Sequence, residues 1–208
     1  MNLVASPKES RASGAFLDVS HDRTRLSLLV ALAAIVAALG QSGSAAAVTR
    51  PESTRGQAVA VSRVTQLGRD LTGEINRLRR AHGLGALRSS PALARAASAH
   101  AVWLATAGSF THDWPAGTPF SHWILGFYPA TGYGAWTAGE NLLWRSPDVT
   151  PGEALALWLA SPPHRRNLLT PSWHELGVGV VRADGASGVY PTDEPVFVVA
   201  TEFGARIR

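Results

Sequence analysis

Apolar residues recur at helical intervals in the middle of the chain. Between residues 64 and 82 they are separated by three or four positions, which predicts an amphipathic helix that ends at Gly83. The segment "SSPALARAASAHAVWLATAG" predicts a second helix, with Ser90 as N-cap, Pro91 in the first turn and Gly108 after the last turn. His100 falls on its inner face, where we expect a packed, hydrogen-bonded histidine rather than a ligand.

Two further helices are predicted after residue 149. In "TPGEALALWLASP", Thr150 and Glu153 have the spacing of a capping box, and Pro151 takes the first helical position. A short helix is expected to follow, with Ser161 as its N-cap and residues 164–169 in its body. In all, four helices are predicted.

The apolar pattern changes to short β-branched runs in the C-terminal part. "LGVGVVRA" and "PVFVVATEFG" predict two antiparallel strands, and "AGENLLW" is a third candidate. Residues 109–138, rich in Gly, Pro and aromatic residues, show no clear period and are expected to form a long loop with a functional role and a tryptophan-rich ligand wall. The resulting fold class is α+β.

The N-terminal 47 residues have the pattern of an export signal. A basic lead precedes the uncharged run "LSLLVALAAIVAALG", and small residues follow it up to Ala47. We therefore expect a signal peptide at 1–47, a linker at 48–63 and one domain at 64–208, which is secreted and has no membrane span after cleavage. An uncleaved anchor is the alternative, although the apolar run is shorter than the ~20 residues of a spanning helix.

Composition and charge narrow the function. The chain has no cysteine, so disulfides, thiolate catalysis and cysteine-ligated zinc are excluded. The formal net charge is +4, too small to indicate nucleic-acid binding. The arginine cluster "RLRR" at 77–80 is expected on a solvated helix face.

Three separated segments carry the candidate chemistry: "FTHDW" with His112, "GENLLW" with Glu140, and "SPPHRRNLL" with His164. A carboxylate among apolar residues needs a partner, and we expect Glu140 to face one or both histidines. Such a cluster could transfer protons or hold zinc through His112 and His164 with an open coordination position.

The same segments, in this order and followed by "LGVGVV" and "VFVVATEFG", resemble the CAP superfamily of cysteine-rich secretory, antigen 5 and pathogenesis-related proteins, whose bacterial branch is called SCP-like. The resemblance covers about residues 71–204. It implies an α-β-α sandwich with a small antiparallel sheet between helical layers. It also implies a cleft whose histidines correspond to His112 and His164 and whose glutamate corresponds to Glu140.

One family position departs from this pattern. Many members have a second glutamate seven residues after the first histidine, where this chain has Pro119. Asp113 or Glu175 could supply that carboxylate instead. We also expect Asn141 to lie in the cleft. The alternative is that Asn141 and Asn167 form hydrogen bonds that hold the backbone of nearby loops.

The resemblance favours a secreted binding module over an enzyme. Its ligand would be a small apolar molecule, such as a lipid or sterol, or a glycan, or a partner protein of the envelope or host. A metal-dependent hydrolase or peptidase, with zinc or another divalent cation on the cluster, is the alternative. A structural envelope protein is the third possibility.

Signal cleavage predicts a mature N-terminus at Val48, because the small residues at 45 and 47 fit the cleavage rule. Mass spectrometry of the exported protein should detect a chain that begins there. Peptides from residues 1–25 in that protein would show that the segment is retained.

Overall fold

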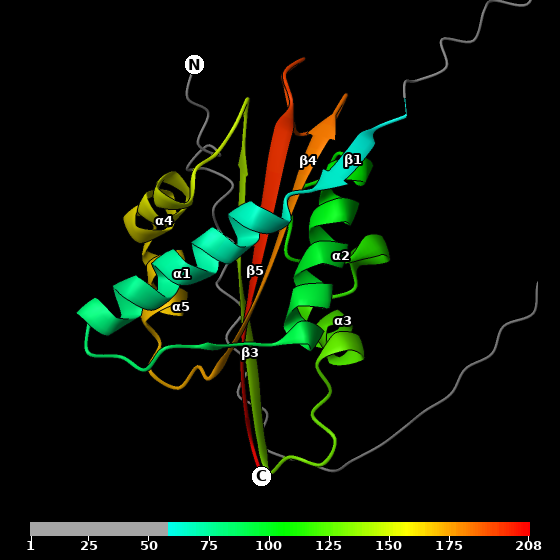
Figure 1. Ribbon diagram of the computed structural model, residues 1–208. Coiled ribbons are helices and arrows are strands. Elements are labelled where there is room, and N and C mark those ends of the chain that lie inside the picture. The colour runs from blue at the N-terminus through cyan, green and yellow to red at the C-terminus, as the bar shows by residue number, and fades with distance from the viewer. Residues whose placement is uncertain (1–57) are drawn as a thin grey trace, which may run out of the picture. The chain divides into compact units, whose positions relative to one another are not determined.

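The computed structural model describes residues 58–208, which form an α-β-α sandwich. Helices α1, α4 and α5 cover one face of the central sheet, and α2 and α3 cover the other (Figure 1). The helices are α1 (Thr65–Ala81), α2 (Pro91–Ala107), the short 3-10 helix η1 (Pro115–Gly117), α3 (Phe120–Phe127), α4 (Pro151–Ala160) and α5 (Pro162–Leu169). The strands are β1 (Ala60–Arg63), β2 (Arg88–Ser89), β3 (Ala135–Arg145), β4 (Glu175–Asp184) and β5 (Val196–Ile207).

The sheet has the order β1-β4-β5-β3, and these neighbours are antiparallel. The two-residue strand β2 adds a short parallel pairing to β4. The three predicted strands are therefore confirmed as β3, β4 and β5. Strand β3 is at one end of this order, so residues from both helical layers can meet around its outer edge.

Helix α2 lies directly on β4 because β4 has glycines on that face. A Cβ atom added at Gly177 would lie 2.1 Å from the backbone carbon of Leu93, and one at Gly179 would lie 2.4 Å from that of Ala97. Real Cβ atoms do not approach so closely, so no side chain fits at either position without displacing the helix. The sequence "LGVGVV" thus sets the distance between α2 and the sheet.

The opposite layer packs large apolar side chains against the other face of the sheet. Leu71 and Ile75 of α1, Trp158 of α4 and Leu168 of α5 are buried in one cluster. Arg79 of α1 is also fully buried. The solvated face predicted for "RLRR" is therefore correct for the exposed Arg77 and Arg80 and wrong for Arg79. Its guanidinium donates hydrogen bonds to the carbonyls of Gly85, Leu168 and Thr170, which joins α1 to the end of α5 and satisfies most of the buried donors.

The predicted helix ends are largely confirmed. Thr150 and Glu153 form the reciprocal capping box of α4, and Gly108 ends α2 in the left-handed conformation with φ 61°. Ser90 and Ser161 occupy the N-cap positions of α2 and α5 but make no side-chain capping bond. The hydroxyl of Ser161 is instead paired with a histidine of its own helix.

Two segment predictions are wrong. Residues 109–138 are not one long loop, because residues 120–127 form α3 and residues 135–138 begin β3. The last four residues of the predicted linker form β1, which pairs with β4. In both cases the pairing or packing partner lies far along the sequence, so local periodicity gave no signal for it.

The predicted signal peptide lies outside the described residues. Within residues 58–208, no helix combines the length and apolar character needed to cross a membrane.

The close packing of α2 on β4 gives a direct test. Gly177→Ala should lower the free energy of unfolding by about 2 kcal/mol or more, because the new methyl group overlaps the α2 backbone. Gly73→Ala in α1 is the matched control, since nothing lies within 4 Å of its added Cβ, and it should stabilise the protein by about 0.5–1 kcal/mol. Urea unfolding of both variants measures these changes, and equal stabilities would contradict the packing argument.

Candidate functional site

The centre of the site is the carboxylate of Glu140 on β3, whose side chain is fully buried. Its Oε2 atom lies 2.5 Å from Nδ1 of His100, and its Oε1 atom lies 2.5 Å from Nδ1 of His112. Each carboxylate oxygen therefore has an imidazole partner. The predicted pairing of Glu140 with His112 is present, and His100 is a partner that the sequence prediction did not assign to it.

The elements that carry these side chains explain how they meet. The alternation of β3 points Glu140 toward α2, on the same sheet face as Ala138 and Leu142. His100 lies on the inner face of α2, as predicted. His112 comes from the segment after α2, where the Trp123 indole of α3 donates a 3.0 Å hydrogen bond to its backbone carbonyl.

The surroundings of the cluster shift the pKa values of Glu140 and His112. Burial by itself would raise the pKa of Glu140, but the charges and hydrogen bonds of His100 and His112 outweigh it and lower that pKa to about 2. Burial opposes the charge on His112, yet its hydrogen bond to Glu140 and the charge of that carboxylate raise the pKa of His112 above 6.5. The site therefore holds an anionic carboxylate and favours the imidazolium form of His112.

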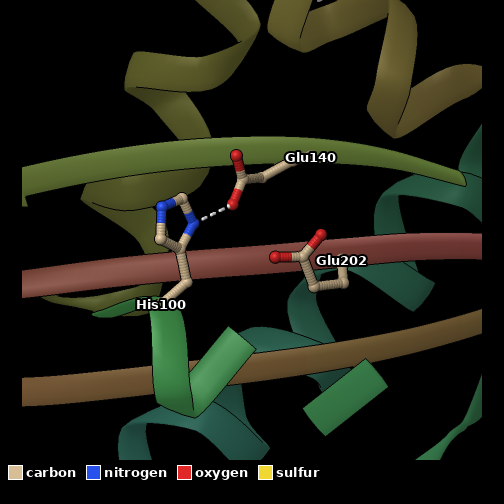
Figure 2. Close-up of side chains that lie close together, drawn as sticks. All are labelled: His100, Glu140 and Glu202. Carbon is tan, nitrogen blue, oxygen red and sulfur yellow. Dashed lines mark hydrogen bonds and ion pairs between the residues drawn. The ribbon is translucent and has the colours of Figure 1, made fainter. Parts of the chain in front are cut away.

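A second buried carboxyl group, Glu202 of β5, adjoins Glu140 (Figure 2). The two residues are directly opposite each other in the β3–β5 ladder, and Glu202 is 0% exposed. Burial and the adjacent charge of Glu140 raise the pKa of Glu202 well above 4.5. The sequence prediction missed Glu202, although the alternation in "VFVVATEFG" places it on the same face as two apolar core residues, Val198 and Ala200.

Aromatic rings enclose His100 on its other sides. Its ring centroid lies 5.7 Å from that of Trp103, 5.5 Å from Trp114 and 4.7 Å from Trp123. Trp123 is a core residue with only 7% exposure, whereas Trp103 and Trp114 are half-buried. Tryptophans that were expected to line a ligand site therefore mainly surround the buried His100. Within the segment 109–138, Trp114 is the half-buried one of the two that contact His100.

His164, in the first turn of α5, lies near this cluster without a direct hydrogen bond to it among the described residues. Its Nδ1 atom pairs with the Ser161 hydroxyl at 2.9 Å. Burial and the charge of His112 lower the pKa of His164 to about 4, although the charge of Glu140 acts in the opposite direction. The structure thus places His164 within electrostatic range of the His112–Glu140 pair, and it is neutral at pH 7.

Asn141 positions α5 against β3 rather than offering a free amide. Its Nδ2 atom donates to the His164 carbonyl at 3.1 Å, and its Oδ1 atom accepts from Asn167 at 3.0 Å. Asn167 also donates to the backbone carbonyl of Glu140. The fully buried Asn141 therefore fixes where His164 lies, which was the alternative prediction for these asparagines.

The other predicted carboxylates do not join the cluster. Asp113 is exposed. Glu175 accepts a hydrogen bond from the Tyr128 hydroxyl and forms an ion pair with Arg206 at 3.4 Å. Among the described residues, the carboxyl group that lies beside Glu140 is that of Glu202.

One group of side chains has a geometry that could hold a metal ion. Within residues 58–208, the group of three side chains whose ligand atoms all lie close enough for one ion is His100, Glu140 and Glu202. It shares only Glu140 with the cluster that the sequence suggested, in which His112 and His164 were the metal ligands.

Two surface cavities lie away from the histidines. One, of about 270 Å³, is bounded by α1, α2 and β4 and has Arg63 and Arg69 at its rim. The other, of about 350 Å³, lies on α5 beside Arg165 and Arg166. Neither is lined by His112 or His164, so the candidate site is defined by its polar chemistry and not by these cavities.

Comparisons with known proteins agree with the fold. The sequence model of the cysteine-rich secretory protein family, CAP, matches residues 72–200. "Uncharacterized protein YkwD" of Bacillus subtilis is 29% identical over 148 residues, which are 71% of this chain and 55% of the relative. The chain thus spans about half the length of that relative.

Two solved structures are also similar to this chain. An extracellular protein of Bacillus anthracis containing an SCP domain matches with a TM-score of 0.51 and 26% identity, over 68% of this chain and 41% of that one. An outer surface protein of Borrelia burgdorferi matches with a TM-score of 0.56 and 21% identity, over 71% of this chain and 99% of that one.

The His112–Glu140 pair predicts a titration change. Glu140→Gln removes the carboxylate charge that favours the imidazolium, so the pKa of His112 should fall. NMR titration between about pH 4 and pH 8 follows this change. The exposed His122, whose side chain is hydrogen-bonded to Ser121, is the internal control. An unchanged His112 titration would contradict the pairing.

Proposed function

Because the chain belongs to the cysteine-rich secretory protein family, we propose that it is an extracytoplasmic binding protein that holds a hydroxyl-bearing ligand between His112 and His164. The ligand classes that fit are a sterol, a lipid head group or a glycan. The observation that carries this proposal is the contrast between the two imidazoles: His112 is hydrogen-bonded to the Glu140 carboxylate, which raises its pKa, whereas burial lowers the pKa of His164 to about 4.

The two histidines offer complementary hydrogen-bonding groups. Glu140 favours protonated His112, whose Nδ1 faces that carboxylate, so its Nε2–H remains as a donor. His164 is neutral, and its Nδ1 is paired with Ser161. When that Nδ1 donates, the Nε2 atom of His164 is an acceptor. A hydroxyl group both donates and accepts, and so it complements this pair.

The aromatic surroundings favour a ligand with an apolar face. Trp114 is half-buried and packs between Trp103 and Trp123, with centroid distances of 5.9 and 5.2 Å. Trp123 in turn holds the backbone of His112. Sugar rings and sterols both have apolar faces with hydroxyl groups at the margin, which matches a polar pair beside aromatic side chains.

Hydrolysis is the less supported function. A general base needs a pKa near the working pH, but Glu140 has a pKa of about 2 and both its oxygens are occupied by imidazoles. Zinc on His112 and His164 would require both rings to be neutral, and Glu140 opposes this at His112. The chemistry therefore supports binding over catalysis.

Action outside the cytoplasm is supported by the signal-like sequence at 1–47 and by family membership. The similar Bacillus anthracis protein is described as extracellular.

The proposal predicts a bell-shaped pH dependence of binding. Affinity should fall below about pH 4, where His164 becomes protonated, and should fall again as the pH rises above the raised pKa of His112. Suitable probes are cholesterol-containing vesicles, phosphatidylglycerol vesicles and N-acetylglucosamine oligomers. His164→Gln should weaken binding of the recognised probe at least tenfold, which corresponds to the loss of one well-made hydrogen bond to a charged or buried group.

His122→Gln is the matched control, because His122 is an exposed histidine outside the site, and it should bind as the wild type does. Binding of no probe, or equal loss in both variants, would contradict the proposal. Binding that rises steadily with pH and disappears with EDTA would instead indicate a metal at the two histidines.

A further inference from the structure

We infer that His100, Glu140 and Glu202 form an interior binding site for a divalent transition-metal ion, which adjoins the proposed ligand site through Glu140 but uses neither His112 nor His164 as a ligand. The inference does not depend on what the outer site binds. It rests on the geometry and the burial of three side chains from α2, β3 and β5 (Figure 2). It also rests on the His100 Nε2 atom and the two Glu202 oxygens, which have no hydrogen-bond partner among the described residues.

The three side chains converge on one point. One ligand atom from each residue lies within 4.8 Å of the others, and all three residues are buried. Ligands of a zinc ion with bonds of about 2.0–2.1 Å lie about 3 Å apart. Nδ1 of His100 and Oε2 of Glu140 are 2.5 Å apart, so a small outward rotation of these side chains would admit an ion.

Glu202 is the observation that points to a missing partner. Both its carboxyl oxygens are buried, and neither has a hydrogen-bond donor among the described residues. Its neighbour in the ladder is another carboxylate, Glu140. An unsatisfied buried carboxyl group costs free energy, and the adjacent charge of Glu140 opposes ionisation of Glu202. A cation at this point would bind the Glu202 oxygens and offset the repulsion between the two groups when both are ionised.

The charges and ligand types select the class of ion. Two carboxylates balance the charge of a divalent cation, which is favourable in an interior of low dielectric constant. One imidazole and two carboxylates suit zinc or manganese. Calcium needs six to eight oxygen ligands, more than these two carboxyl groups provide.

The surroundings would hold the ion tightly. Trp103, Trp114 and Trp123 surround the His100 ring, and His112 holds the second oxygen of Glu140. Such outer contacts fix the orientation of metal ligands and exclude water. Access requires local opening, so the ion should exchange slowly.

Metal titration of the purified full-length chain tests the inference. After treatment with a chelator under partly unfolding conditions and refolding, the wild type should take up one equivalent of Zn²⁺ or Mn²⁺ and melt at a higher temperature with the ion than without it. Glu202→Gln keeps the shape of the side chain but removes the ligand charge, and it should lose at least tenfold in affinity. His164→Gln, which alters only the outer site, should retain wild-type uptake and the same rise in melting temperature.

Three results would overturn the inference. The first is wild-type uptake by Glu202→Gln, and the second is no uptake by the wild type. The third is loss of uptake in His164→Gln with retention in Glu202→Gln, which would place the metal at the outer site and also contradict the proposed function.

X-ray absorption of the zinc-loaded wild type makes the test independent of whether Glu202→Gln folds. One imidazole in a shell of oxygen ligands supports the interior site, whereas two imidazoles overturn it. Failure of the sterol, lipid and glycan probes to bind, with normal metal uptake, would remove only the proposed function.

Discussion

A single buried carboxylate, Glu140, holds together the parts of the molecule that carry its chemistry. Its two oxygens are shared between His100 of α2 and His112 of the following segment. An ionised carboxylate without partners would be very costly in this interior. The strand, the helix and the segment must therefore come together as a unit, and the positions of α3 and of the tryptophans around His100 follow from that arrangement.

The absence of cysteine makes such polar links more important. Although the chain belongs to a family named for cysteines, it has none. Side chains that donate to distant backbone carbonyls connect the layers instead. Arg79 joins α1 to the end of α5, and Asn167 joins α5 to β3. These bonds connect residues far apart in sequence, as a disulfide would, but each depends on correct packing around it.

The sequence predicted the parts of the fold that depend on local patterns. The spacing of apolar residues, the capping box at Thr150 and the glycine at position 108 correspond to observed helices and ends. The strand β1 and helix α3 were not predicted, because a four-residue strand and an eight-residue helix carry little periodicity and depend on tertiary partners. The prediction that His112, Glu140 and His164 lie in one site depended on the resemblance to the family, because their separation along the chain gives no local signal.

The roles of Glu202 and His100 show where prediction from sequence ends. Each is a polar residue in an apolar pattern, and alternation or helical spacing gives the face on which it lies. Only the alignment of β3 with β5 reveals that Glu202 is opposite Glu140, and that alignment involves strands separated by 50 residues of chain. The sequence could therefore indicate that these residues face inward, but not which residues they meet.

The placement of Glu140 also has a consequence for how the chain finds its fold. Strands β3 and β5 are paired over eleven residues, and many of those residues are apolar on both faces, so hydrophobicity alone discriminates weakly between neighbouring alignments. A shift of β3 by one residue would turn Glu140 to the side of α5, away from both imidazoles, and would direct Asn141 toward α2. The misaligned pair of strands would bury an unpaired charge and break the hydrogen bonds that hold α5. The Glu140 carboxylate thus also specifies the register of the β3–β5 pair, because it raises the free energy of misaligned pairings that the apolar residues alone would tolerate.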